Sequence, residues 1–192
     1  MACLSETQIR AMGFASVGDN VRLSDKASYY NCPNIHLGNH VRVDDFCVLS
    51  AGTGGITIGN YIHIAVYSSL IGAGNITLMD YCNISSRVSI YSSNDDYSGA
   101  AMTNPTLPPA YTNVQEADVC IGRHVIIGSG TIVLPGINIA EGAAIGALSL
   151  VKSNCLAFGI YAGVPATFIR ERERGLLAVE RDFTATLRPH SG

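Results

Sequence analysis

Aliphatic residues recur every six positions over most of this chain. From residue 121 onward, each six-residue block begins with isoleucine or valine, and the period does not slip. The leading residues are Ile121, Ile127, Val133, Ile139, Ile145 and Val151. An α-helix places apolar residues about 3.6 positions apart and a strand alternates by two, so neither element alone produces this period. A short strand followed by a turn, repeated many times, does produce it. The pattern therefore predicts an all-β solenoid in which each block sends one side chain into a shared core.

The same period, with interruptions, runs through the first half of the chain and indicates how the coils stack. Three blocks per coil give a triangular prism with one block on each face. Two lengthened blocks, one at residues 52–55 and one after Leu70, then fall at the same point of their coils, which supports this grouping. Three columns of leading residues are predicted: Leu37, Ile58, Leu78 and Ile121; Val43, Ile64, Ile84 and Ile127; and Leu49, Leu70, Ile90 and Val133.

The 192 residues are interpreted as one domain with irregular parts around the repeats. Residues 1–36 should form a short helix, opened by a Ser-x-x-Gln capping box, and an imperfect coil that covers the open end. Residues 37–156 should form the repeats. Residues 92–118 lack the period and hold three of the seven prolines, so a long functional excursion loop is expected there. Residues 157–192 should form a C-terminal extension with a short charged helix and a frayed tail that includes His190.

Composition restricts the class of protein. The chain contains no apolar run of about 18 residues, so no transmembrane helix is expected. Its N-terminus lacks the pattern of a secretory signal. The net charge is −3 and lysine and arginine do not cluster, which argues against a nucleic-acid partner. The six cysteines form no Cys-x-x-Cys pair, so reduced structural thiols in a cytoplasmic protein are expected, with Cys47 and Cys82 in the core.

Two segments carry a resemblance to a known family. The repeats IGSGTIVLPGINIAEGAAIGALSLV and the exit segment YAGVPATFIR are similar to those of hexapeptide-repeat acyltransferases, over residues 37–172. The loop segments DDYSG and NPTLPP resemble the subgroup that acts on sugars, including galactoside, maltose, O-antigen and nucleotide-sugar acetyltransferases. The resemblance implies a left-handed parallel β-helix and a homotrimer that binds acetyl-CoA between neighbouring subunits.

One departure from that family concerns the catalytic base. Relatives such as galactoside acetyltransferase carry a catalytic histidine in the loop, but residues 92–118 here contain none. Among the histidines elsewhere, His63 directly precedes the leading residue Ile64, so its side chain should point outward. The predicted columns place Arg42 one coil below it and Asn83 one coil above, and the loop is expected nearby. His63 is therefore the candidate base, and a solvated surface histidine is the alternative. The other histidines are in the first coils (His36), at turn positions expected to be solvated (His40 and His124) and in the tail (His190).

Several polar residues are candidates for the sugar site. Asp95 and Asp96 in the loop could orient His63 or accept hydrogen bonds from sugar hydroxyls, although adjacent aspartates also form turns. Asn83 and Tyr97 are possible sugar contacts. Arg87 should face outward, where it could pair with a substrate phosphate or with Asp80.

The last coils offer candidates for the CoA site. Small residues would let the pantetheine arm approach the backbone, although they also serve ordinary coil turns. Cations near the end of the solenoid could bind the CoA phosphates, or could be ordinary solvated charges. The candidates are Gly128, Ser129, Gly146, Ala147 and Ser149 for the pantetheine arm, and Lys152, Arg170 or Arg172 for the phosphates.

These features favour transfer of an acetyl group from acetyl-CoA to a sugar hydroxyl, in the synthesis of a cell-surface polysaccharide such as O-antigen lipopolysaccharide or capsule. The alternative is N-acetylation of a nucleotide-linked amino sugar, because a neutral amine requires less help from a base. A metalloenzyme such as γ-carbonic anhydrase would need three converging histidines, and no third one accompanies His63 and His124, so no metal is expected. A non-catalytic trimeric scaffold is the remaining alternative.

Overall fold

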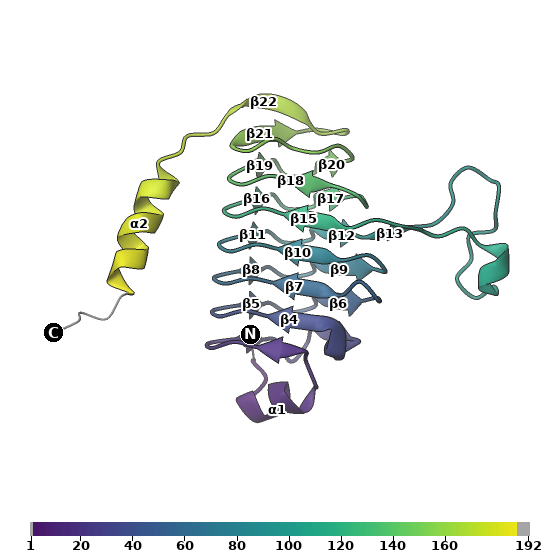
Figure 1. The fold of residues 1–192 in the computed structure, drawn as a ribbon, viewed down its shortest axis with the longest axis horizontal. Helices are drawn as coiled ribbons and strands as arrows, with labels where there is room; N and C mark the ends of the chain where they lie inside the picture. Colours follow the sequence, from purple (N-terminus) through teal and green to yellow (C-terminus); the bar gives the residue numbers. More distant parts are fainter. Residues whose placement is uncertain (1, 188–192) are drawn as a thin grey trace.

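The computed structural model describes residues 2–187, which wind into a parallel β-solenoid with three faces (Figure 1). In Figure 1 the strands of the front face run from right to left, and the chain returns behind them as it climbs, so the winding is left-handed. This hand is opposite to that of most parallel crossover connections. The predicted fold class is confirmed.

The three faces are three parallel sheets. The first face contains β1 (Ser16–Val17), β4 (Ile35–Leu37), β7 (Ile56–Ile58), β10 (Ile76–Leu78), β15 (Val119–Ile121) and β18 (Asn138–Ile139). The second contains β2 (Arg22–Leu23), β5 (Arg42–Val43), β8 (His63–Ile64), β11 (Asn83–Ile84), β16 (Ile126–Ile127), β19 (Ala144–Ile145), β21 (Gly159–Ala162) and the antiparallel β22 (Thr167–Glu171). The third contains β3 (Ser28–Tyr30), β6 (Val48–Ala51), β9 (Ser69–Gly72), β12 (Ser89–Tyr91), β17 (Ile132–Val133) and β20 (Leu150–Val151).

The strand register confirms the three predicted columns of leading residues. On the second face, for example, Ile84 pairs with Ile64 below it and with Ile127 above it. The leading residues of the columns are almost completely inaccessible to solvent. Cys47 and Cys82 are also buried in this core, as expected. Each coil therefore buries its apolar side chains only because coils lie above and below it.

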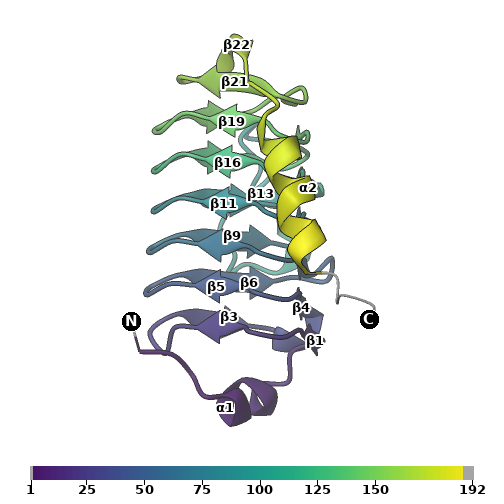
Figure 2. The ribbon, with the colours of Figure 1, turned by 90° about the vertical axis from the view of Figure 1, so that its left-hand side faces the viewer.

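The ends of the solenoid are closed differently. At the N-terminal end, α1 (Glu6–Ala11) begins with the predicted capping box, in which Ser5 and Gln8 bond reciprocally, and Ile9 is buried against the first coil. At the other end the chain leaves through β22 and enters α2 (Leu176–Thr186), which runs alongside the stacked coils (Figure 2). His190 and the predicted tail lie outside the described residues. No helix among residues 2–187 is long and apolar enough to cross a membrane.

The irregular segment projects as one long excursion (Figure 1). It leaves the third face after β12 and returns to the first face at β15. At its base, β13 (Ser93–Asn94) and β14 (Gln115–Glu116) form an antiparallel pair, and a short 3-10 turn spans Pro109–Tyr111. The loop therefore emerges from the edge between the third and first faces.

The corner between the first and second faces carries a ladder of stacked rings, formed by His40, Tyr61, Tyr81 and His124. Successive ring centroids are 4.5, 5.4 and 4.8 Å apart, and all four residues have positive φ. The left-handed backbone conformation costs a non-glycine residue about 1–2 kcal/mol. Stacking of the rings contributes about 0.5–1.5 kcal/mol per pair and partly offsets this cost.

The ladder also holds α2 against the prism. Phe183 of α2 packs edge-on against Tyr61 at 5.2 Å, and the Glu180 carboxylate accepts a hydrogen bond from His124 Nε2 at 2.8 Å. The His124 side chain is consequently only 12% exposed. The expectation of a solvated His124 is therefore wrong, whereas His40 is exposed as expected.

The burial of the columns predicts how the solenoid responds to truncation of a side chain. Ile84→Ala should lower the free energy of unfolding by about 2–5 kcal/mol, because it leaves a cavity in the core. Ile132→Ala is the matched control, since Ile132 lies on a strand of the same solenoid but is 40% exposed. Urea unfolding followed by circular dichroism would compare the two variants, and equal losses would contradict this account of the core.

Candidate functional site

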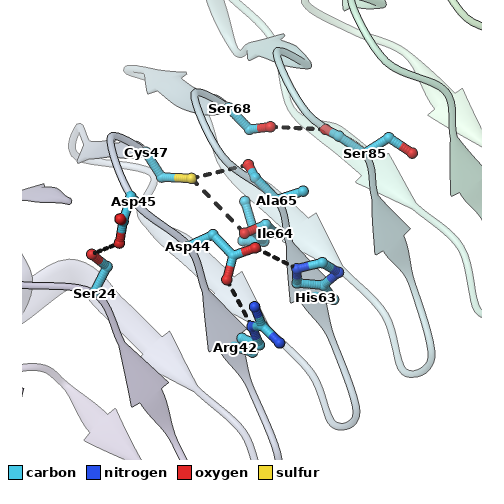
Figure 3. A network of polar contacts seen from close by, with 10 residues as sticks. All are labelled: Ser24, Arg42, Asp44, Asp45, Cys47, His63, Ile64, Ala65, Ser68 and Ser85. Carbon is cyan, nitrogen blue, oxygen red and sulfur yellow. Dashed lines mark hydrogen bonds and ion pairs between the residues drawn. The ribbon is translucent and has the colours of Figure 1, made fainter. Parts of the chain in front are cut away.

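His63 lies on β8 of the second face and belongs to a chain of three polar residues (Figure 3). Its Nε2 atom is 2.8 Å from Oδ2 of Asp44. The other carboxylate oxygen of Asp44 accepts a hydrogen bond from Nε of Arg42 at 2.7 Å. Arg42 and Asn83 flank His63 in the register, as the columns predicted. Asp44 thus joins the two basic side chains.

The environment of Asp44 keeps it ionised. Its side chain is nearly buried, which by itself would raise the pKa of the carboxyl group. Hydrogen bonds from His63 and Arg42, together with their charge, outweigh this effect and hold the pKa of Asp44 below its ordinary value. The second face therefore carries a fixed negative charge directly beside the His63 ring.

Asp44 was not among the candidates predicted from the sequence, although the repeat shows that its side chain faces outward. Asp44 follows the leading residue Val43, and His63 precedes the leading residue Ile64 in the next coil. Because leading residues face inward and strand neighbours alternate, both side chains must face outward from adjacent strands. The register itself pairs His63 with Arg42, so the contact of His63 with Asp44, two residues further along the chain, is diagonal and is shown only by the structure.

The position of His63 relative to the loop differs from what was expected. His63 lies on the second face, whereas the loop emerges from the edge between the third and first faces. In a triangular prism this edge is opposite the second face. Within one chain the loop is therefore not beside His63, and the expectation that it would be is wrong.

The two loop aspartates have different surroundings. Asp96 is 5% exposed, and its two carboxylate oxygens accept hydrogen bonds from the backbone N–H groups of Ser98 and Ala101, both at 2.8 Å. Hydrogen bonding with Ser98 is the main cause that holds the pKa of Asp96 below its ordinary value. Asp95 and Tyr97 are exposed, Tyr97 by 87%. Asp96 thus shapes the loop, and Asp95 and Tyr97 are accessible.

Asn83 and Arg87 lie on or near the face that carries His63. Asn83 is exposed on β11, one coil above His63. Arg87 is at the corner between the second and third faces, where its guanidinium group covers the Tyr67 ring at 5.5 Å. Asp80, the alternative partner considered for Arg87, instead accepts hydrogen bonds from the backbone and side chain of Asn60.

The CoA candidates divide into accessible and internal positions. Ser129 and Ala147 are exposed at the corner of the second face, and Lys152 and Arg170 are exposed near the C-terminal end of the solenoid. A Cβ atom on Gly128 would come within 2.5 Å of the backbone nitrogen of Ala147, and one on Gly146 within 2.8 Å of Ala162 Cβ, so these glycines are required for close stacking of the coils.

Ser149 has a structural position. It is buried, and its hydroxyl group donates a hydrogen bond to the carbonyl oxygen of Gly146 at 2.7 Å. This inward orientation does not favour the ligand contact expected from its small size. Among residues 2–187, no three histidine, cysteine or acidic side chains are grouped as metal ligands.

The sequence and the fold can be compared with those of known proteins. No family model matches the chain. A dTDP-4-amino-4,6-dideoxy-D-glucose acyltransferase from Escherichia coli is 61% identical over 183 residues, which covers 95% of this chain and 95% of that enzyme. The chain belongs to the hexapeptide-repeat sugar acyltransferases.

Solved structures of this family include AntD, an N-acyltransferase from Bacillus cereus. Its complex with dTDP and 3-hydroxybutyryl-CoA is 44% identical, with a TM-score of 0.92 over 96% of this chain and 97% of that chain. A serine-to-alanine variant of AntD was solved with dTDP-4-amino-4,6-dideoxyglucose and coenzyme A, and an aspartate-to-asparagine variant with dTDP and coenzyme A. WbbJ from Escherichia coli K12, a putative lipopolysaccharide O-acetyl transferase, is 32% identical over only 60% of this chain and 57% of its own length. The comparisons thus favour the N-acylation alternative over sugar O-acetylation.

The bonding of Asp96 predicts the behaviour of the loop. In Asp96→Ala, the amides of Ser98 and Ala101 lose their acceptor and should exchange their hydrogens about tenfold faster or more, since a hydrogen bond to a charged group is worth about 1.5–3 kcal/mol. Asp95→Ala is the matched control and should leave this exchange unchanged. Hydrogen–deuterium exchange of the peptide that contains both amides measures the effect, and equal exchange in the two variants would contradict the assignment.

Proposed function

We propose that this enzyme transfers an acyl group from an acyl-CoA to the amino group of a dTDP-linked 4-amino-4,6-dideoxyhexose. The observation that carries the proposal is the 61% identity to an enzyme with that acceptor, over 95% of both chains. The AntD complexes, which contain the nucleotide sugar and coenzyme A, support the same pair of substrates. Both are substrates of the cytoplasm, which is the proposed location.

The chemistry of an amine agrees with the residues present. A sugar hydroxyl is a weak nucleophile and needs a general base, such as a histidine, to remove its proton as it attacks a thioester, but a neutral amine attacks with its own lone pair. After the attack the nitrogen carries a positive charge and loses its proton readily, so a carboxylate is a sufficient acceptor. The N–C bond forms, the C–S bond breaks and the CoA thiolate leaves. The lack of a histidine in residues 92–118 is compatible with this reaction.

We further propose that the site is shared between subunits of a homotrimer. In one chain, the second face with His63 and the edge that carries the loop are on opposite sides of the prism. A heterologous contact, repeated until the ring closes, would place the loop of one subunit over the second face of the next.

In this arrangement the candidate residues have separate roles. Asp95 of the loop accepts the proton from the attacking amine, while His63 and Asn83 of the neighbouring face hydrogen-bond the acceptor. Tyr97 and Arg87 contact the sugar and the diphosphate.

Ser129 and Ala147 line the pantetheine arm, with Lys152 and Arg170 beside the CoA phosphates. Asp96 maintains the loop, and Gly128, Gly146 and Ser149 maintain the wall through their coil contacts.

The proposed acceptor can be tested with a matched pair of sugars. We expect dTDP-4-amino-4,6-dideoxyglucose to support rapid CoA release. The matched sugar dTDP-6-deoxyglucose has a hydroxyl in place of the amine, and we expect it to react at least about 10²-fold more slowly, because a hydroxyl needs general-base catalysis to attack the thioester. Thiol release would be measured with acetyl-CoA and with 3-hydroxybutyryl-CoA as donors. Comparable rates for the two sugars would instead support O-acylation.

The shared site can be tested by mixing inactive subunits. His63→Ala and Asp95→Ala should each lower kcat by about 10²-fold or more. If each site takes the two residues from different subunits, equal co-expression should restore about a quarter of the wild-type rate, because that fraction of random trimer interfaces has both residues intact.

The control for this experiment is a mixture of each variant with the His63→Ala/Asp95→Ala double variant, which cannot form an intact interface. No recovery in the co-expressed mixture, with trimers of both subunit types demonstrated by differently tagged chains, would mean that each subunit supplies both residues.

A further inference from the structure

We propose that Asp44 is a positioning residue that keeps the hydrogen of the His63 ring on Nε2, so that Nδ1 is the nitrogen offered to the acceptor substrate. The inference rests on the proposed function, in which His63 hydrogen-bonds the acceptor. It concerns a residue that does not itself touch the substrate. The geometry that supports it is the Arg42–Asp44–His63 chain (Figure 3).

The chemistry of the carboxylate identifies the donor in this contact. An ionised carboxylate can only accept hydrogen bonds, so the 2.8 Å contact between Asp44 Oδ2 and His63 Nε2 requires a hydrogen on Nε2. In the neutral imidazole, the other nitrogen then carries the lone pair. No hydrogen bond reaches His63 Nδ1 from any side chain or backbone group within residues 2–187. A substrate N–H or O–H group could therefore donate to Nδ1.

The stacked coils hold the Asp44–His63 pair rigidly. Asp44 and His63 are each adjacent to a buried leading residue, and Val43 and Ile64 are paired in register between β5 and β8. Because a slip by one residue would expose the aliphatic column, the strands cannot shift relative to each other. Arg42 holds the second oxygen of Asp44 at 2.7 Å, which prevents the carboxylate from rotating freely.

The same molecule contains a second carboxylate–imidazole pair. His124 Nε2 is also 2.8 Å from a carboxylate, that of Glu180 on α2. However, the His124 ring is stacked on Tyr81 at 4.8 Å and its side chain is 12% exposed, whereas the His63 side chain is 40% exposed. The two pairs share the same chemistry, but His63 is far more accessible to a substrate.

The decisive variant is Asp44→Asn, which preserves the shape of the side chain. Arg42 can donate only to the amide oxygen, so the amide NH₂ group is left facing His63 Nε2. Nε2 must then accept, and the ring hydrogen moves to Nδ1. We expect kcat to fall by about 10²-fold with the amino-sugar acceptor, because the lone pair no longer faces the substrate.

The ring can be observed directly by ¹⁵N NMR of histidine-labelled enzyme, with the His63 signals assigned from a His63→Gln variant. At a pH where the ring is neutral, the wild type should show hydrogen on Nε2, and Asp44→Asn should show it on Nδ1. The matched control is Asp45→Asn. Asp45 is the next residue in the same turn, but it bonds Ser24 and Lys26 instead of His63. We expect it to keep the wild-type tautomer and kcat within about twofold, as surface ion pairs contribute little.

The outcomes separate this inference from the proposed function. If NMR of the wild-type enzyme showed the ring hydrogen on Nδ1, the proposed role of Asp44 would be overturned. This measurement does not depend on whether Asp44→Asn folds. An unchanged tautomer and kcat in a folded Asp44→Asn would also overturn it. If the tautomer moved as expected but the wild type acylated no dTDP-amino sugar, the proposed function would fail, and the assignment of Asp44 as the residue that orients His63 would stand.

Discussion

The inward column of aliphatic side chains on each face is the constraint on which the rest of this structure depends. One leading residue per block is buried, and its strand is only two to four residues long in the regular coils. The only stable register between neighbouring coils is therefore the one that superimposes these residues. Once the inward positions are determined, the outward positions are determined too. For this reason Arg42, Asp44, His63 and Asn83 form a contiguous polar group although they lie in three successive coils.

The same stacking divides the molecule into surfaces with different properties. The lower coils of the second face present the outward polar side chains of Arg42, His63 and Asn83. The edge opposite to this face carries the loop, and the corner between the first and second faces carries the aromatic ladder. The ladder in turn holds α2, and Arg172 secures the connection by donating hydrogen bonds to the carbonyl oxygens of His124 and Gly142. A single chain thus presents the loop and the His63 group on separate surfaces, which supports the proposal that the site is shared between subunits.

Sequence reasoning succeeded where a local pattern repeats. The columns, the capping box at Ser5, the bounds of the loop and the neighbours of His63 were all predicted from spacing. It failed where an interaction depends on the third dimension. Glu180 and His124 are 56 residues apart, and nothing in the period indicates that α2 returns to the ladder. His63 was expected to lie beside the loop, and this was wrong, because residues in neighbouring coils can lie on opposite sides of a prism.

The sequence by itself determined the solenoid and its register, because a strict period of apolar residues admits one way of burying them all. It also determined which side chains face outward, since these alternate with the buried ones. Only the tertiary structure decided which outward groups meet: Asp44 with His63 and Arg42, and Asp96 with the backbone of its own loop. Such contacts depend on side-chain rotamers and on the conformation of irregular turns. A hydrogen bond requires a distance of about 3 Å and a suitable angle, and a six-residue pattern of apolar residues specifies neither.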